Sequence, residues 1–381
     1  MRIAIVGAFP FPLPQGSQVY CAEQARALQA AGAEVELLVY GSGAGALPAA
    51  ARGLAITRVP RALSPRRLGS GPHAAKPLAD LVLAAILLRA HRRRRFDAVL
   101  AHNAEAALAA LAVRPLLRRP VAYVAHTLWR HELASHAPGP LATRLAVPLA
   151  ELGAGLDALV ARRCDAVLAL APAAGRALAP HAHGPLAVIP PMLEPAPDPA
   201  PRAVAGACAR HGLEPGRFAL YAGNLDAYQA LATLAAVARR MRAPIVVATH
   251  ATGVAPAPLR TVHAADAAVT RLLTFGAGVA VLPRRAPGGF PVKLLNYLEA
   301  RRAVVARRGI AAGLVHGESA CLLPDDAGPA VWAEAIDALL DDPSRAARLG
   351  AGGRAALERG HDPDALARAT LGLLARAGAR P

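Results

Sequence analysis

The chain has 381 residues, enough for two ordinary domains, and its 54% hydrophobic content with no long polar tract excludes an intrinsically disordered protein. Its formal net charge of +17 indicates an anionic partner: nucleic acid, an anionic membrane or a phosphorylated small molecule. Only 4% of the residues are aromatic and no nucleic-acid-binding module is recognisable. We therefore predict no nucleic-acid partner, and instead a nucleotide ligand or an anionic lipid surface.

The cysteines and the N-terminus bear on where the protein works. The four cysteines are far apart, with no CxxC spacing and no histidine at metal-ligand spacing, which predicts buried thiols, a reducing compartment and no metal site. The start, MRIAIVGAFPF, lacks a signal-peptide cleavage site, and no stretch has the ~18 uninterrupted apolar residues of a spanning helix. We expect a cytoplasmic protein, soluble or peripheral on the inner membrane face.

The first hundred residues predict a doubly wound α/β domain. Residues 2–7 are an apolar strand, followed by a proline-rich loop that closes on Gln15-Gly16-Ser17, a helix over 18–31 and a strand over 35–40. Gly7 and Gly16 stand nine residues apart, which does not fit the dinucleotide fingerprint G-x-G-x-x-G and disfavours a nicotinamide enzyme. A further strand is expected over 54–59.

An apolar helix is predicted over 78–88, and it continues into a run of basic residues over 89–95. Two interpretations of this basic end stay open. Arginines at a helix C-terminus interact favourably with the helix dipole, which needs no partner. The same arginines on an exposed surface would attract an anionic membrane.

Polar side chains follow two of the next predicted strands. The strand over 96–101 ends in His102-Asn103, and the strand over 121–125 ends in His126-Thr127. Ligand-binding groups of open α/β sheets gather at the carboxyl ends of strands, so these positions suit a site, although each residue alone is more often structural. Helices over 104–111 and 143–163 and strands over 166–171 and 187–189 complete this half.

Residues 190–201 contain six prolines and predict an interdomain linker. Strand–helix alternation then restarts, and residues 272–275 have no clear assignment. The predicted strands are 218–222, 245–249, 279–282, 303–306 and 320–323, and the predicted helices are 229–240, 332–340, 343–359 (capped by Asp342) and 363–377.

One stretch of this second half carries the most specific signal. After the strand over 279–282 comes a Pro/Gly loop over 287–291, and then a helix that begins near Val292. Unpaired N–H groups at the start of such a helix favour a phosphate. Lys293 in the first turn is one of only two lysines, and Asn296 one turn later is one of only three asparagines. The sequence predicts a phosphate site here.

With these motifs the chain resembles the GT-B glycosyltransferases, specifically the family 4-like retaining enzymes (glycosyl transferase group 1). The resemblance covers nearly the whole chain. It is carried by PFPLPQGSQVY (10–20), YAGNLDAYQAL (221–231), VLPRR (281–285) and PGGFPVKLLNYLEA (287–300). It implies two Rossmann-like doubly wound domains facing a cleft: an acceptor domain over 1–190, onto which 363–381 packs back, and a nucleotide-sugar donor domain over 191–362.

The resemblance also implies roles for single residues. Gly16, beside Ser17, matches a loop glycine at the donor diphosphate, and His126 matches a histidine that lines the sugar site. Gly223, beside Asn224, matches the glycine after the first strand of the donor domain. Three loop residues match the segment whose amides hold the donor, and Asn296 matches the second glutamate of an E-x7-E signature, which binds ribose. The loop residues are Gly289, Phe290 and Pro291.

The chain departs from the family pattern at both signature glutamates, because Gly288 stands at the first and Asn296 at the second. An amide can still donate to and accept from a ribose hydroxyl. The arginine and lysine expected soon after Gly223 are also absent. The cations that we predict for the leaving diphosphate are Lys293, Arg284 and Arg285.

The implied activity is transfer of a sugar, with retention and without an obligatory metal or cofactor, from a nucleotide-sugar co-substrate to a lipid-linked, cell-envelope or polysaccharide acceptor. Three alternatives stay open. A catalytically inactive GT-B scaffold would explain the missing glutamates. A sugar-nucleotide epimerase would need more carboxylates, and a basic membrane-binding module would leave the glycine turns unexplained.

Overall fold

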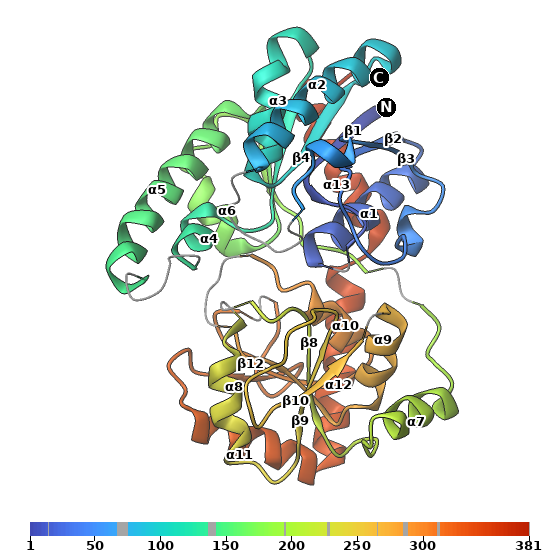
Figure 1. Cartoon of the computed structure of the whole chain (residues 1–381), viewed down its shortest axis with the longest axis vertical. Helices are drawn as coiled ribbons and strands as arrows, with labels where there is room; N and C mark the ends of the chain where they lie inside the picture. Colours follow the sequence, from blue (N-terminus) through green and yellow to red (C-terminus); the bar gives the residue numbers. More distant parts are fainter. Residues whose placement is uncertain are drawn as a thin grey trace. The chain divides into compact units, whose positions relative to one another are not determined.

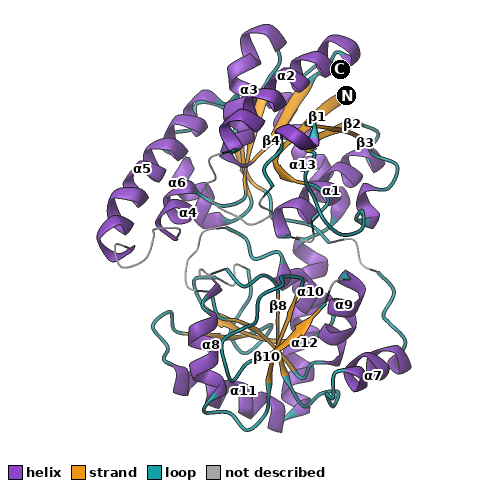
Figure 2. Cartoon of the chain, viewed as in Figure 1, coloured by secondary structure: helices purple, strands orange, loops and turns teal. Residues whose placement is uncertain are grey.

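The computed structural model describes residues 1–13, 15–66, 75–135, 142–193, 196–226, 229–264, 266–284, 289–310 and 313–380. The chain divides into two compact units, each built around its own parallel sheet (Figures 1 and 2). Unit 1 comprises Met1–Met192, Gly288–Phe290 and Pro363–Pro381, and unit 2 comprises Leu193–Pro287 and Pro291–Asp362.

Unit 1 contains a seven-stranded sheet in which every described pairing is parallel. The order reverses between β1 and β4, which makes the carboxyl ends of these two strands the topological switch point of the sheet. Continuous apolar sequences form the central strands because both of their faces are covered by helices. In sheet order the strands are β3 (Ala55–Arg58), β2 (Glu34–Tyr40), β1 (Arg2–Pro10), β4 (Ala98–His102), β5 (Val121–Ala125), β6 (Ala166–Ala169) and β7 (Leu186–Val188).

The helices of unit 1 cover both faces of this sheet. The C-terminal helix α13 lies beside α1, where Gln24 Nε2 donates to Thr370 Oγ1 at 3.4 Å (Figure 1). Helices α2 and α3 pack together and add their apolar faces to the same core as the strands. The helices are α1 (Gly16–Ala30), α2 (Lys76–Arg94), α3 (Asn103–Leu117), α4 (Trp129–Ser135), α5 (Ala142–Arg163), α6 (Pro172–Leu178) and α13 (Pro363–Arg376), with short 3₁₀ turns at Ala49–Ala51 and Arg61–Leu63.

Unit 2 repeats the same plan with six parallel strands. Its switch point lies between β8 and β11, so the residues that follow these strands meet at one edge of the sheet. In sheet order the strands are β10 (Arg260–His263), β9 (Ile245–Thr249), β8 (Ala219–Ala222), β11 (Val279–Leu282), β12 (Ala303–Arg307) and β13 (Cys321–Leu323). Its helices are α7 (Pro201–Arg210), α8 (Leu231–Ala238), α9 (Ala267–Gly276), α10 (Lys293–Glu299), α11 (Pro329–Asp341) and α12 (Pro343–Gly360).

The predicted fold class of two Rossmann-like α/β domains is confirmed. The structure adds four helices, α4, α6, α7 and α9, and the strand β10, which the sequence did not reveal. Asp342 caps α12 as predicted, because its Oδ1 accepts from Arg345 N at 2.9 Å. All four cysteines are buried and free, as expected. In the described part of the chain, no helix combines the length and the apolar character needed to cross a bilayer.

Candidate functional site

The switch-point edge of unit 2 brings Gly223, after β8, against Lys293, the first residue of α10. A Cβ atom on Gly223 would lie 2.6 Å from Lys293 Nζ, so glycine is what allows the amine to approach the end of β8. Tyr221 completes the contact: its ring centroid lies 4.0 Å from Lys293 Nζ, and its hydroxyl accepts from that nitrogen at 2.6 Å. The predicted donor glycine and the predicted cation are therefore neighbours.

Lys293 is held in a fixed position by a chain of polar side chains. Its Nζ also donates to Gln229 Oε1 at 3.0 Å. Gln229 Nε2 donates to Asn224 Oδ1 at 2.9 Å, and Asn224 Nδ2 donates to Asp226 Oδ2 at 2.6 Å. Asn224, predicted as a donor-binding residue, thus uses its side chain within the protein to orient the residues around the amine.

The electrostatics of this edge leave positive charge uncompensated. Burial lowers the pKa of Lys293 well below its ordinary value, and the nearby charge of Arg284 lowers it further, while Asp226 opposes the shift. Arg284, which follows β11, is itself buried. Two cationic side chains at one partly buried edge are stabilised by an anion that binds between or beside them.

The remaining predicted donor residues differ in what the structure says of them. Asn296 lies in α10, one turn after Lys293, and is exposed, so its side chain is accessible to a ligand. Pro291 is buried just before α10. Arg285 and Gly288 lie outside the described residues.

In unit 1 a pair of histidines occupies the ends of β4 and β5. The two strands pair with His102 opposite Val124, so His126, two residues further along, is the diagonal neighbour of His102 on the same face. His102 Nδ1 and His126 Nε2 are hydrogen-bonded at 2.8 Å. Tyr20 of α1 meets His126 edge-on, with 5.3 Å between ring centroids.

Both imidazoles of this pair are neutral. Burial lowers the pKa of His126 to about 3, and burial and the neighbouring ring lower the pKa of His102 well below its usual value. One proton therefore joins the two rings. No group among the described residues bonds to His102 Nε2, and an orphaned buried N–H is rarer than an orphaned acceptor. We assign the shared proton to His102 Nδ1, which leaves His126 as a donor through Nδ1–H.

Two other predicted donor residues lie close to His126. Gly289 forms an antiparallel bridge with Thr127, and a Cβ atom on Gly289 would lie only 1.9 Å from the carbonyl oxygen of His126. Gly16 and Ser17 begin α1, one turn before Tyr20, which contacts His126. Phe290 is buried beside Gly289. In unit 1 the structure therefore gathers His126, Gly289 and the start of α1.

Sequence reasoning missed the residues that position the predicted ones. Tyr221 and Gln229 hold Lys293, and His102 holds His126, but each pair joins residues far apart in the chain. Glu299 was also missed. It is buried at the end of α10, where its Oε1 receives Arg271 Nη2 at 2.9 Å and its role is structural. The described residues contain no cluster of three or more His, Cys, Asp or Glu side chains suited to a metal ion.

Comparison with solved structures assigns the class of fold. Sucrose-phosphate synthase from Thermosynechococcus elongatus is 17% identical, with a TM-score of 0.77 over 99% of this chain and 98% of that one. Anabaena HepE in complex with UDP and glucose is 13% identical, with a TM-score of 0.73 over 98% and 99% of the two chains. WaaG, a glycosyltransferase involved in lipopolysaccharide biosynthesis, is 13% identical, with a TM-score of 0.66 over 98% and 99%. The chain has the GT-B fold.

The sequence places the N-terminal half within a family. Residues 14–196 match the family described as Glycosyltransferase Family 4. This range runs from the loop before α1 to the segment that follows unit 1, and it contains both histidines of the buried pair. No curated protein sequence matches the chain. A Glycosyltransferase Family 4 domain therefore forms the N-terminal part of a chain whose whole fold is GT-B, and the resemblance seen in the sequence is confirmed.

Proposed function

We propose that the protein transfers a sugar, with retention and without a metal ion, from a nucleoside-diphosphate sugar to a hydroxyl of its acceptor. The observation that carries the proposal is the pair of cations, Lys293 and Arg284, at the switch-point edge of unit 2. A nucleotide diphosphate is the anion that suits such an edge in this fold. The HepE structure with UDP and glucose is of the same fold and supports a nucleotide-sugar donor.

In the proposed reaction the bond between the sugar C1 and the diphosphate oxygen breaks, and its electron pair leaves with the diphosphate. The acceptor oxygen forms the new bond to C1 and loses its proton. Lys293 and Arg284 stabilise the charge that grows on the leaving group, an effect that is stronger at a partly buried site than in water. Arg285 would add a third charge from the same loop. Asn296 binds the ribose hydroxyls.

In the same proposal, His126 orients the transferred sugar. Its assigned tautomer carries a proton on Nδ1, which can donate to a sugar hydroxyl, while His102 fixes the ring through Nε2. Because the pKa of His126 is lowered to about 3, the ring stays a neutral donor through the physiological range. Gly16, Ser17 and Gly289 bring backbone groups close to the donor, and Asn224 supports Lys293 from the other unit.

Binding of nucleoside diphosphates by titration calorimetry tests this assignment. We expect UDP, GDP or ADP to bind, and to bind with proton uptake, because an anion raises the lowered pKa of Lys293 in the complex. Repeating the titration in buffers with different heats of ionisation measures that uptake. Affinity should fall as the pH rises through the pKa of the complex. Release of the diphosphate from UDP-glucose in the presence of acceptor then tests transfer itself.

A second candidate is an inactive GT-B scaffold, favoured by Gly288 and Asn296 at the positions of the two signature glutamates. The two candidates differ in turnover rather than in fold. Diphosphate binding without any release from a panel of nucleotide sugars would favour the scaffold. Release that depends on Lys293 would favour the enzyme.

The acceptor and the place of action belong to the same proposal. We expect a lipid-linked, cell-envelope or polysaccharide acceptor, and reversible attachment to the inner membrane face through the basic end of α2. Arg92, Arg93 and Arg95 are exposed there, whereas Arg94 Nε pairs with Glu36 Oε2 at 2.9 Å. Each arginine near an anionic surface contributes about 1 kcal/mol.

Vesicle co-sedimentation tests the attachment. The protein should pellet with phosphatidylglycerol vesicles at low salt and be released at high salt, because salt screens surface charge. Arg92→Glu combined with Arg93→Glu should abolish pelleting, and reversal of the exposed Arg239 and Arg240 in unit 2 is the matched control. Equal binding to neutral vesicles would contradict an electrostatic attachment.

A further inference from the structure

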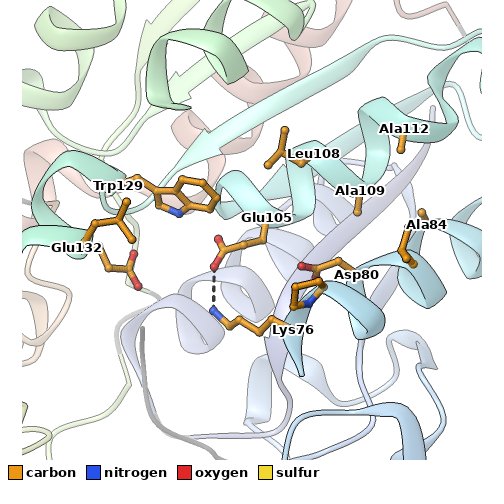
Figure 3. Close-up of a pocket in the computed structure, with 12 residues that line it drawn as sticks. Lys76, Asp80, Ala84, Glu105, Leu108, Ala109, Ala112, Trp129 and Glu132 are labelled. Carbon is orange, nitrogen blue, oxygen red and sulfur yellow. Dashed lines mark hydrogen bonds and ion pairs between the residues drawn. The ribbon is translucent and has the colours of Figure 1, made fainter. Parts of the chain in front are cut away.

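Unit 1 contains a cavity of about 410 Å³ that none of the predicted site residues lines. We refer to it as the α2–α3 slot, because it runs between these two helices and is closed at one end by α4 (Figure 3). Its lining comes from Lys76, Pro77, Asp80, Leu81, Ala84, Glu105, Leu108, Ala109, Ala112, Trp129, Glu132 and Leu133.

The slot exists because small residues face each other across it. Ala84 on α2 and Ala109 and Ala112 on α3 stand where longer side chains would fill the groove between two packed helices. From Lys76 to Ala84 the groove follows α2 for about 12 Å at 1.5 Å per residue. The walls are otherwise alkyl and aromatic. Such a long, narrow and apolar space fits a hydrocarbon segment.

The polar side chains lie together in the close-up and give the slot a charged end (Figure 3). Lys76 Nζ pairs with Glu105 Oε1 at 2.8 Å, and Asp80 accepts a hydrogen bond from the Tyr40 hydroxyl. With Glu132, the lining carries three carboxylates against one lysine. This local excess of negative charge disfavours an anionic head group. Carboxylates accept hydrogen bonds from hydroxyls, so an uncharged, hydroxyl-bearing head suits this end.

The charged end lies close to the histidine pair along the chain. Helix α3 starts directly after His102, and Glu105 is in its first turn; Trp129 follows His126 by three residues and starts α4. The helices that follow strands in this fold start at the carboxyl edge of the sheet. A ligand with its apolar part in the slot therefore has its head near the edge where His126 lies.

We propose that the α2–α3 slot binds the hydrocarbon segment of the sugar acceptor, and that the acceptor is an amphiphile whose reactive end is uncharged and hydroxylated. This inference rests on the proposed glycosyl transfer, and it names the class of acceptor. It also explains why the groove between α2 and α3 is lined by alanines while the rest of the unit 1 core is closely packed.

Trp129 provides a direct reporter. It is one of two tryptophans in the chain, and the other, Trp332, is buried in the core of unit 2. In a Trp332→Phe background, hexyl, octyl and decyl β-glucosides, each below its micelle concentration, should shift the emission of Trp129. Each added methylene group should raise the affinity about fourfold, which corresponds to ~0.8 kcal/mol. No change in emission, or an affinity independent of chain length, would overturn the proposal.

Filling the slot should abolish this response. Ala109→Phe and Ala112→Phe each place a ring in the lining, whereas Ala85→Phe places the same ring on an exposed position of α2 outside it. We expect loss of binding in the first two variants and unchanged binding in the third. Ala112 is exposed at the slot, so Ala112→Phe is expected to fold even if Ala109→Phe does not. Unchanged binding in a folded Ala112→Phe protein would contradict the proposal.

The head group has its own test. At moderate salt, decyl glucoside should bind at least tenfold more tightly than decyl sulfate, because the local carboxylates repel the sulfate. Tighter binding of the sulfate would overturn the assignment of an uncharged head. With a competent donor, Ala112→Phe should raise the KM for an alkyl glucoside acceptor and leave the Kd for nucleotide unchanged. Absence of glucoside binding with intact nucleotide binding would refute the slot alone, whereas the reverse pattern would refute the donor site alone.

Discussion

The two switch-point edges of this molecule share a strand order and differ in charge. In unit 1, the edge at β4 and β5 holds a neutral histidine pair whose pKa values are lowered by burial. In unit 2, the edge at β8 and β11 holds Lys293 and Arg284, which burial and mutual repulsion make unfavourable without an anion. The same topology thus provides the position of a site, and a few side chains decide which ligand the site accepts.

The difference also shows how the proposed work is divided. A neutral imidazole can donate a hydrogen bond to a sugar without attracting phosphate, whereas clustered cations stabilise a leaving diphosphate. Each edge is fixed by residues that the ligand need not touch: His102 behind His126, and Tyr221 and Gln229 behind Lys293. Removing the cation, crowding a glycine, protonating the histidines and shortening Asn296 perturb the comparison in decreasing order.

Lys293→Met should have the largest effect, because it removes the cation and keeps the apolar stem. We expect kcat to fall by about a hundredfold or more, with a smaller change in donor KM, since the contact with the leaving diphosphate strengthens in the transition state. Steady-state kinetics with the true donor measures this split. The exposed Arg239→Met is a control on the same unit. Turnover at the level of the unsubstituted protein would show that Lys293 has only a structural role.

A matched pair of glycine substitutions compares the rigidity of the two edges. Gly223 and Gly289 have similar φ values of 148° and 154°, so the backbone term of a change to alanine is nearly the same in both. Gly289→Ala pushes a Cβ against the backbone carbonyl of His126, whereas Gly223→Ala meets the movable end of Lys293.

We therefore expect Gly289→Ala to lower the free energy of unfolding by about 1–3 kcal/mol more than Gly223→Ala. Gly223→Ala should instead weaken diphosphate binding, because it displaces the amine. Denaturant unfolding and calorimetry on both variants measure the two effects. Equal destabilisation by the two substitutions would show that the His126 carbonyl moves as easily as the lysine.

Acid should destabilise unit 1 through the histidine pair. The folded pKa of His126 is about 3 and the unfolded value is ~6.5, so the unfolded chain binds a proton that the folded chain does not. The contribution to stability is complete above pH ~6.5 and is lost as the pH falls towards 3. Between pH 7.5 and pH 5 this loss amounts to about 2 kcal/mol for His126.

The pH dependence of thermal or denaturant unfolding measures this loss. His126→Gln should flatten the slope between pH 5 and pH 7, and His183→Gln, at an exposed position, should not. The comparison concerns slopes rather than absolute stabilities, because other groups titrate in the same range. A slope that survives in His126→Gln would assign the acid sensitivity to other residues.

Asn296→Ala should have the smallest effect. Losing two hydrogen bonds to the ribose is expected to raise the nucleotide Kd about fivefold to tenfold. Titration calorimetry with the diphosphate measures it, and the 2′-deoxynucleotide should bind the variant and the unsubstituted protein with more similar affinities. An unchanged Kd would mean that the exposed amide of Asn296 does not touch the nucleotide.

Much of the fold was predictable because buried parallel strands are continuous apolar segments. Val279–Leu282 and Ala303–Arg307 are plain in the sequence for this reason. Helix α7 was missed because Pro201, its first residue, also ends a proline-rich run that predicts a linker. Strand β10 is the edge strand Arg260–His263, whose sequence RTVH lacks the apolar run of a central strand.

The site was predictable in its residues but less so in their contacts. Lys293 and His126 stand at motif positions and strand ends, which local sequence reveals. The partners Tyr221 and His102 act only through the register of neighbouring strands and the approach of α10 to β8. The α2–α3 slot could not be predicted, because an alanine in a helix gives no sign of whether it faces a cavity or a close neighbour.

The position of α13 has a consequence for the order in which the protein is completed during synthesis. Leu366, Leu373 and Leu374 of this helix are buried, and they belong to unit 1 although they follow all of unit 2 in the chain. While the ribosome makes residues 193–362, the surface of α1 around Gln24 lacks its covering helix. Domains generally fold as they emerge, so unit 2 can close first and the N-terminal unit last. The nascent N-terminal unit is the form for which a chaperone would matter most.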